Sequence, residues 1–400
     1  MRLAGSTHDV GPASRPARRR VARWLAAVVV AGGLAVGVYV ALPASAAAGQ
    51  WYQVSAGGWH TCGITASRSL YCWGSNASGQ LGVGDNANRS TPTRVGTSSS
   101  WASVSAGANH TCALKNDGTR YCWGLNDHGQ LGLGDNSDRN EPRRLTGETP
   151  WASISAAPGG KHTCGVTAGG VGKCWGLNTY GNLGRGNTAD RNTPGSVSGG
   201  HVWETITTGA THTCGLDSDG LRYCWGNNSG HELGILDDNT GRLVPTFVDD
   251  GGPWLSMQSG FFTTCGIAPS TNRLYCFGRN DYGQAGRGDR IPHDDVHRVN
   301  SWSWSTVSVG GGHTCGVRTN GTAYCWGHNE AGELGLGNTA DQLIPAAVSS
   351  QSPLWTAVTA GGNHTCGIRD NANLYCWGYN KQGQLGIGTT TSARSPVLVP

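Results

Sequence analysis

Fourteen cysteines divide most of this 400-residue chain into seven similar units. The two cysteines of a pair lie 10 residues apart, once 11, and the first cysteines of successive pairs lie 50 to 52 apart. The pairs are Cys62 and Cys72, Cys112 and Cys122, Cys164 and Cys174, Cys214 and Cys224, Cys265 and Cys276, Cys315 and Cys325, and Cys366 and Cys376. A period of this length is typical of folds in which each repeat is one supersecondary element that buries its apolar face only against its neighbours.

The repeat accounts for the whole chain from residue 51 onward. The expected units are about 51–100, 101–150, 151–202, 203–253, 254–303, 304–354 and 355–400. Glycine makes up 65 of the 400 residues and charged residues only 14%. Glycine disfavours long helices, so the composition favours many short strands joined by tight turns.

One unit illustrates the strand pattern. Trp101 to Ala106 alternates apolar and small residues, and His110 to Leu114 follows a glycine turn. Asn116-Asp117-Gly118 is a hairpin signal, because these residues tolerate positive φ. Arg120 to Trp123 and a short segment around Pro142 to Leu145 complete four strands. Seven such units predict an all-β fold, a seven-bladed β-propeller of four-stranded antiparallel blades.

The cysteines of each unit should form one disulfide within the blade. Cys112 and Cys122 are symmetric about Asp117, so they would face one another on neighbouring strands. An even number of cysteines in an exported chain favours disulfides. A zinc site would require CxxC-type spacing, which is absent. Closing a loop of about ten residues stabilises the fold by roughly 2–3 kcal/mol.

The N-terminal segment resembles a secretory signal. Five arginines between Arg15 and Arg23 precede an apolar run from Leu25 to Leu42, and Ala44-Ser45-Ala46 follows. This order predicts a signal peptide over residues 1–46, with cleavage after Ala46 or Ala48. An uncleaved membrane anchor is the alternative, because the run is just long enough to span a bilayer. In either case the remainder lies outside the membrane, and we expect a secreted protein exported by the general or the twin-arginine route.

Charge and motifs exclude several functions. The net charge of +4 comes from the N-terminal arginines, and the rest of the chain is near neutral. Nucleic-acid binding requires clustered basic residues, so no such partner is expected. There is no GxSxG elbow, no phosphate loop and no repeated nucleophile and base. We therefore expect a non-enzyme without cofactors.

The residues around the cysteines resemble a known repeat. The motif reads G-x-x-H-T-C, then Y-C-W-G-x-N-x-x-G-Q-L-G-x-G. In the second unit it comprises Gly107, His110, Thr111, Trp123, Gly124, Asn126, Gly129, Gln130, Leu131, Gly132 and Gly134. It is similar to the repeat of the regulator of chromosome condensation (RCC1) family, which implies one propeller blade per repeat. The cysteine pair resembles that of exported members.

The nucleotide exchange for which this family is best known is not expected here. An exported protein would not meet a cytosolic GTPase. The protruding wedge that performs exchange in that family has no counterpart, because no unit has an insertion longer than a few residues.

Recurrent residues favour structural roles over ligand binding. The histidines could form a ring that binds a metal or an anion, but a sevenfold ring spreads ligands too widely for a metal ion, and we expect each to hydrogen-bond backbone groups of its blade. Two tryptophan sets should pack between and within blades, with sugar stacking as the alternative. Asp and Asn in the long loops suit turns better than calcium. The histidines are His60, His110, His162, His212, His313 and His364; the tryptophans are Trp51, Trp101, Trp151, Trp203, Trp254, Trp304 and Trp355, with Trp73, Trp123, Trp175, Trp225, Trp326 and Trp377.

The fifth unit departs most from the pattern. Thr263 occupies the histidine position, and Phe261 and Phe262 precede it. With Trp59 and Lys161 in the equivalent turns, these residues are the predicted binding patch, since exposed aromatic residues beside a cation are common interface anchors. Neutral drift in one blade is the alternative.

The sequence thus predicts an extracellular binding scaffold. We expect a monomer that binds another protein through one propeller face, with carbohydrate or cell-wall binding as the alternative. The group His293, Asp294, Asp295 and His297 could hold a metal, but we expect it to be a solvated loop. No metal site is predicted.

Overall fold

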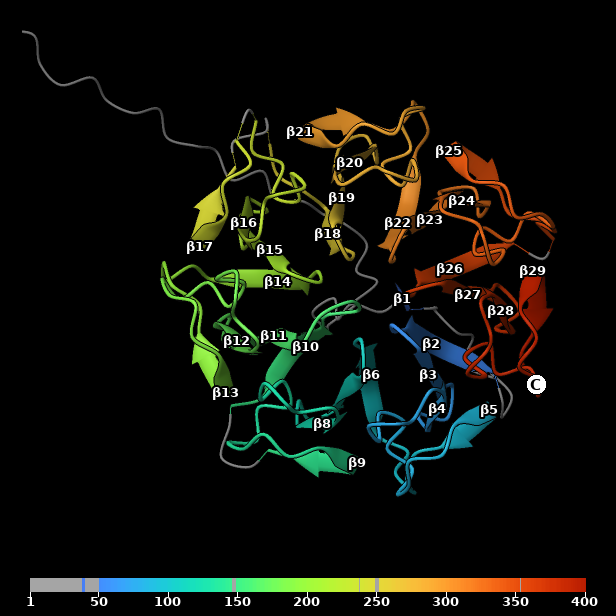
Figure 1. Ribbon diagram of the computed structural model, residues 1–400, viewed down its shortest axis with the longest axis horizontal. Helices are drawn as coiled ribbons and strands as arrows, with labels where there is room; N and C mark the ends of the chain where they lie inside the picture. Colours follow the sequence, from blue (N-terminus) through green and yellow to red (C-terminus); the bar gives the residue numbers. More distant parts are fainter. Residues whose placement is uncertain (1–37, 40–49, 146–148, 237, 249–251, 353) are drawn as a thin grey trace, which may run out of the picture. The chain divides into compact units, whose positions relative to one another are not determined.

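The computed structural model describes residues 38–39, 50–145, 149–236, 238–248, 252–352 and 354–400. Strands make up the regular structure of these ranges, and no helix occurs in them. Within the unit that residues 33–400 form, seven sheets surround a common centre (Figure 1). The prediction of a seven-bladed β-propeller is confirmed.

Each blade contains four strands in sequence order, from the centre outward (Figure 1). The innermost strands are β2 Trp51–Ala56, β6 Trp101–Ala106, β10 Trp151–Ala156, β14 Trp203–Thr208, β18 Ser256–Ser259, β22 Trp304–Val309 and β26 Trp355–Ala360. The second strands are β3 His60–Thr65, β7 His110–Lys115, β11 His162–Thr167, β15 His212–Asp217, β19 Thr263–Ile267, β23 His313–Arg318 and β27 His364–Arg369.

The outer half of each blade completes the sheet. The third strands are β4 Leu70–Gly74, β8 Arg120–Gly124, β12 Gly172–Gly176, β16 Arg222–Gly226, β20 Leu274–Gly278, β24 Ala323–Gly327 and β28 Leu374–Gly378. The outermost strands are β5 Arg89–Arg94, β9 Arg139–Arg144, β13 Arg191–Ser196, β17 Arg242–Phe247, β21 His293–Arg298, β25 Gln342–Ala347 and β29 Ala393–Leu398. A two-residue strand, β1 Val38–Tyr39, pairs with β2. The rest of the predicted signal segment lies outside the described residues.

The disulfides join the second and third strands of each blade. Cys62 lies directly opposite Cys72 in the antiparallel register, and the equivalent pair recurs in all seven blades. The Cα atoms are 4.1–4.2 Å apart. No cysteine is free. One intra-blade disulfide per blade is therefore confirmed.

The ring closes without sharing a strand between its two ends. The first blade is built from β2–β5 and the last from β26–β29. The amide of Gly362 donates to the carbonyl of Gly57 at 3.0 Å, and the amide of Ala56 donates to Thr359 Oγ1 at 3.2 Å. The same kinds of contact join the other blades, so the closing seam resembles the internal ones.

Both tryptophan sets lie between blades, where they form most of the core. The cluster between the first and second blades contains the Cys62–Cys72 disulfide, Trp101 and Trp123. Trp123 Nε1 donates to the carbonyl of Gln80 in the preceding blade at 2.9 Å. Every member of both sets is at least nine-tenths buried. They are packing residues, as expected, and none has a free face for a sugar.

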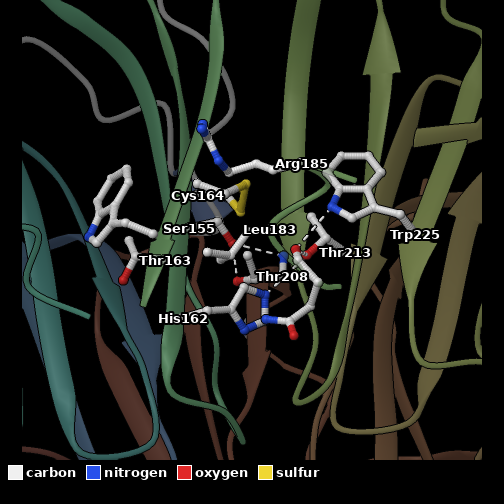
Figure 2. Close-up of a disulfide and its surroundings, with 12 residues drawn as sticks. Ser155, His162, Thr163, Cys164, Leu183, Arg185, Thr208, Thr213 and Trp225 are labelled. Carbon is white, nitrogen blue, oxygen red and sulfur yellow. Dashed lines mark hydrogen bonds between the residues drawn. A yellow bond between two sulfur atoms is a disulfide. The ribbon is translucent and has the colours of Figure 1, made fainter. Parts of the chain in front are cut away.

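The recurrent histidines bind the next blade rather than their own backbone. His60 Nε2 lies 2.8 Å from Thr111 Oγ1, and the bond from His162 to Thr213 repeats it between the third and fourth blades (Figure 2). The hydroxyl of Thr111 already donates to the carbonyl of Gln80 at 2.8 Å, so the imidazole must donate through Nε2. The prediction that each histidine bonds backbone groups of its own blade was wrong, because the turn brings each ring against a threonine of the neighbouring blade.

The seam between the fifth and sixth blades lacks two of these repeated bonds. Thr263 replaces the histidine, and its hydroxyl donates to the carbonyl of Arg279 in its own blade at 2.7 Å. Gln258 replaces the serine or threonine that elsewhere accepts an amide of the next blade, as Ser55 does from Ala106 at 3.0 Å. Thr314 still donates to the carbonyl of Gln284 at 2.8 Å, which preserves part of the seam.

Acid should destabilise this fold between about pH 6.5 and pH 3. Burial lowers the pKa of six seam histidines from 6.5, to about 3 for His60, His162, His212 and His364 and to about 4 for His110 and His313. The unfolded chain binds more protons in this window, so falling pH favours unfolding. Each histidine contributes about 1.4 kcal/mol per pH unit. The thermal unfolding midpoint should decrease as the pH is lowered below about 6.5, and it should change little above that pH.

A single-histidine variant provides the control. His162→Gln removes one titrating group from the folded seam, so its midpoint should depend less steeply on pH than that of the unmodified protein. Equal steepness in the two proteins would contradict the assignment of this acid sensitivity to the histidines.

Candidate functional site

One end of the propeller carries two connections of every blade. In each blade the turn between the first and second strands, such as 57–59, and the loop between the third and fourth strands, such as 75–88, leave the sheet at the same end. We call this end the loop face. The opposite end, with the hairpins between the second and third strands and the connections between blades, is the hairpin face.

A buried asparagine holds each long loop in place. Asn126 is fully buried; its side chain donates to the carbonyl of Asp135 at 2.9 Å and accepts the amide of Leu131 at 2.9 Å. Asp135 forms an ion pair with Arg139 at 2.6 Å. These acidic side chains serve turn geometry, and the described residues contain no group of three or more His, Cys, Asp or Glu that could hold a metal ion.

The centre of the loop face is almost closed. Backbone hydrogen bonds connect successive turns, as from Gly58 to Gly107 and from Ala108 to Ala157, both at 2.9 Å. The cavity along the central strands has a volume of only about 20 Å³. This cavity is therefore no larger than a water molecule needs.

The two phenylalanines of the predicted patch lie half-buried at this centre. Phe261 packs against Gly159 of the third blade, where an added Cβ would lie 2.4 Å from its Cδ1 atom. Phe262 lies beside the guanidinium of Arg279, 5.5 Å from its ring centre. The two rings are 6.5 Å apart. Phe261 thus covers the axis, and Phe262 faces the loop of its own blade.

Lys161 lies in a polar sector of the loop face. Its Nζ atom is 2.5 Å from Asp127 Oδ2 in the second blade. His128, next to that aspartate, lies 2.7 Å from Asp190 of the third blade. These charges pair with one another across the seam between the second and third blades, so Lys161 is not a free cation.

Trp59 lies beside a large cavity of the loop face. Its ring is 39% exposed and contacts Tyr379 edge-on at 6.0 Å. Tyr379 lines a cavity of about 510 Å³ between the loops of the sixth and seventh blades. On the other side, His328 lines the same cavity and contacts Tyr282 of the fifth blade at 4.5 Å.

Ring contacts at two seams and a shared cavity at the third form a band of side chains across three seams of the loop face. We call it the aromatic arc, and it consists of Tyr282, His328, Tyr379 and Trp59 in order from the fifth blade to the first, together with Phe262 of the fifth blade. Its cavity lies within the size range of small-ligand and side-chain pockets. Of the four predicted patch residues, Trp59 and Phe262 belong to this arc.

A buried carboxylate charges the cavity wall of the sixth blade. Glu333 is 1% exposed, and it accepts the amide of Ala331 at 2.9 Å. His328 Nδ1 lies 3.5 Å from Glu333 Oε1, and this contact raises the pKa of the histidine. His328 and Glu333 therefore lie close enough for a protonated imidazole to offset the carboxylate within the wall.

The charged group of the fifth blade does not converge on one point. His293 Nε2 lies 3.0 Å from Asp289, while His297 pairs with Asp295. Asp295 also lies 3.2 Å from Arg287. The two histidines bind different acids of the strand and loop, which is not the arrangement of a metal site.

Comparison with known proteins identifies the repeat. Models of the regulator of chromosome condensation (RCC1) repeat match residues 69–114, 117–166, 174–216, 320–368 and 371–400, and a second model of the same repeat matches 51–80, 101–130, 255–284, 304–333 and 355–384. The chain belongs to the RCC1 repeat family.

Similar RCC1 proteins include a plant receptor. The chain is 34% identical over 251 residues to the ultraviolet-B receptor UVR8 of Arabidopsis thaliana, covering 61% of this chain and 57% of that protein. Human WBSCR16 and Prp20p of Saccharomyces cerevisiae share the fold, each with a TM-score of 0.74 and 20% identity. These structures cover 83% and 84% of this chain, and 94% and 87% of their own. No helix in the described part of the chain is long and apolar enough to cross a membrane.

Several residues of the arc were not predicted from the sequence. Tyr282, His328 and Tyr379 lie at ordinary positions of the RCC1 repeat, and only the fold shows that they adjoin one cavity. Position-by-position comparison of the seven repeats would have found Lys381 and Arg394, two further cavity residues that are basic in the seventh repeat alone.

Replacing Phe261 and Phe262 together by alanine should leave the RCC1 propeller folded. Both are half-buried, and the seams are held by backbone and threonine bonds that these rings do not make. We expect a loss of about 1–2 kcal/mol for each ring. Phe277→Ala in the same blade is the control, because its fully buried ring should cost about 3–5 kcal/mol. Circular dichroism and thermal unfolding compare them; a double variant that no longer folds would show that the pair is core.

Proposed function

We propose that this protein is a secreted, non-catalytic RCC1 propeller that binds another protein through the aromatic arc. The observation that carries the proposal is that the arc, from Tyr282 to Trp59, crosses three seams around a cavity of about 510 Å³. Tyrosine and tryptophan beside a pocket are typical of interface anchors. Two other cavities in the described part of the ring are smaller, at about 70 Å³ and 20 Å³.

Relatives with the same repeat favour a protein partner. Prp20p, which shares the fold, binds Gsp1p and histones. UVR8 is a receptor. We infer a protein partner of different identity here, because the loops that would contact it differ between blades and carry no nucleotide-exchange insertion. In such a fold the function depends on the residues of the loops rather than on the propeller that carries them.

The disulfides favour export. Seven buried disulfides and no free thiol suit an oxidising compartment. The arginine-rich and apolar N-terminal segment, residues 1–46, supports the same location.

Export predicts a defined mature N-terminus. When the full chain is expressed in a host that secretes, the protein in the medium should begin at Ala47 or Gly49, the residues after the two expected cleavage points. Intact-mass measurement with and without reductant should also show a difference of fourteen hydrogens, two per disulfide. Recovery of the uncleaved chain in the membrane fraction would favour the anchor instead.

Partner binding should depend on the aromatic arc. A photo-reactive benzoylphenylalanine at position 282 should cross-link a protein from the native culture medium, and replacing Trp59 and Tyr379 by alanine should abolish the product. The matched control is Val202→Ala with Leu255→Ala, which removes comparably exposed apolar side chains from the hairpin face and should leave cross-linking unchanged.

Two results would overturn this assignment. If both pairs of variants cross-linked the partner equally, the arc would not be part of the interface. Glycan-array binding that depends on Trp59 and Tyr379, with no protein cross-linked, would replace the protein partner by a carbohydrate.

A further inference from the structure

The seventh blade differs from the other six at three places that line a single cavity. The first is the loop before its outermost strand, where Thr389, Thr390, Thr391 and Ser392 occupy four positions. Each of the other six blades has at least one aspartate in those positions. In the seventh blade all four side chains are hydroxyls, and Thr391 and Ser392 line the cavity of about 510 Å³.

The second and third differences are cations. Lys381 follows the buried asparagine of its loop, where the other blades have Ala77, Asp127, Thr179, Ser229, Asp281 and Glu330. Arg394 is the second residue of β29, where the other blades have Ser90, Asn140, Asn192, Leu243, Asp294 and Leu343. Both positions are basic in the seventh blade alone, and both side chains line the same cavity.

These two cations have no ion-pair partner among the described residues, unlike Arg89 and Arg139 of the first and second blades. Arg89 and Arg139 are each paired with an aspartate of their own loop, at 2.5 Å and 2.6 Å. Among the described residues no carboxylate lies within ion-pair distance of Lys381 or Arg394, and both are exposed. The hydroxyl-only loop removes the acids that would otherwise neutralise them.

The acids of the cavity lie on its opposite wall, which the sixth blade forms. Glu330 Oε2 is 3.7 Å from His328 Nε2, and Glu333 is 3.5 Å from Nδ1 of the same ring. Both carboxylates are therefore close to a histidine whose pKa they raise. The wall of the seventh blade keeps two uncompensated positive charges, with hydroxyl and amide donors from Thr391, Ser392 and Asn363 beside them.

We propose that this cavity is an anion site that receives an acidic side chain of the protein partner. Lys381 and Arg394 supply the charge, and the hydroxyls and Asn363 supply neutral donors. A carboxylate on a peptide fits because Tyr379 and Trp59 adjoin the cavity and offer apolar contact to the rest of the chain. This inference rests on the proposed protein-binding function and names the chemistry that the arc recognises.

Peptide titration tests the site directly. The probe is acetyl-tetraglutamate amide, with acetyl-tetralysine amide as its opposite, titrated into the whole secreted protein by calorimetry. Tetraglutamate should bind in the millimolar range and more weakly as salt increases, whereas tetralysine should bind at least tenfold more weakly.

Substitutions taken from the second blade identify the charges responsible. Lys381→Asp and Arg394→Asn copy Asp127 and Asn140, which the same fold already accommodates. Together they should weaken tetraglutamate binding at least tenfold. Arg143→Asp with Arg144→Asn changes the net charge equally on the exposed outer strand of the second blade and should leave binding unchanged. Thr391→Asp, which restores an acid to the loop, should also weaken binding.

Three outcomes would overturn the proposal. They are equal weakening by the two charge-changing pairs, no tetraglutamate binding by the unmodified protein, and binding of inorganic phosphate or galacturonate at least as tight as that of the peptide. The cross-linking at position 282 separates these from failure of the proposed function. A partner that still cross-links with Lys381→Asp and Arg394→Asn present leaves the arc as an interface but removes the anion site.

Discussion

A buried carbonyl in each long loop is the acceptor on which the ring depends. The carbonyl of Gln80 accepts the hydroxyl of Thr111 at 2.8 Å and the indole of Trp123 at 2.9 Å, both from the next blade. Such a group left without partners away from water costs about 1–3 kcal/mol. A blade therefore needs its neighbour to satisfy its own polar groups, and the contact repeats around the ring. The loop glycine at Gly82 is required here, because an added Cβ would lie 2.6 Å from Trp123 Nε1.

The histidine fixes which groups donate and which accept in this contact. Because Thr111 donates to the carbonyl, it can only accept from His60, and the imidazole is fixed as the neutral tautomer with its proton on Nε2. Burial keeps it neutral by lowering its pKa to about 3. The same geometry that makes the seam specific therefore makes it sensitive to acid. In the fifth blade Thr263 removes this sensitivity from one seam only.

The repeat explains which parts of the structure the sequence could predict. The cysteine spacing and the Asn-Asp-Gly hairpin determine which strands pair and place Cys112 opposite Cys122, since both are local relations within one unit. The partner of His110 was not predictable in the same way, because Thr163 lies 53 residues away and meets the ring only when adjacent blades are docked. The cavity was still harder to predict, because its walls come from two blades. No sequence pattern within one repeat relates Lys381 to Glu333.

A closed ring with a disulfide in each blade also affects which residues can change to alter binding in this protein. The buried asparagines, such as Asn126, hold each loop in a fixed backbone conformation, so a partner meets a surface that is already ordered and loses little conformational freedom to it. Side chains at the loop tips can then change without cost to the seams. The seventh blade shows this separation, because Lys381 and Arg394 alter the charge of the cavity while Asn380 still accepts the amide of Leu385 at 2.9 Å. Lys381 and Arg394 therefore change the charge of the cavity without replacing the asparagine that holds the loop, which is why a sequence dominated by its repeat can still carry a single distinctive site.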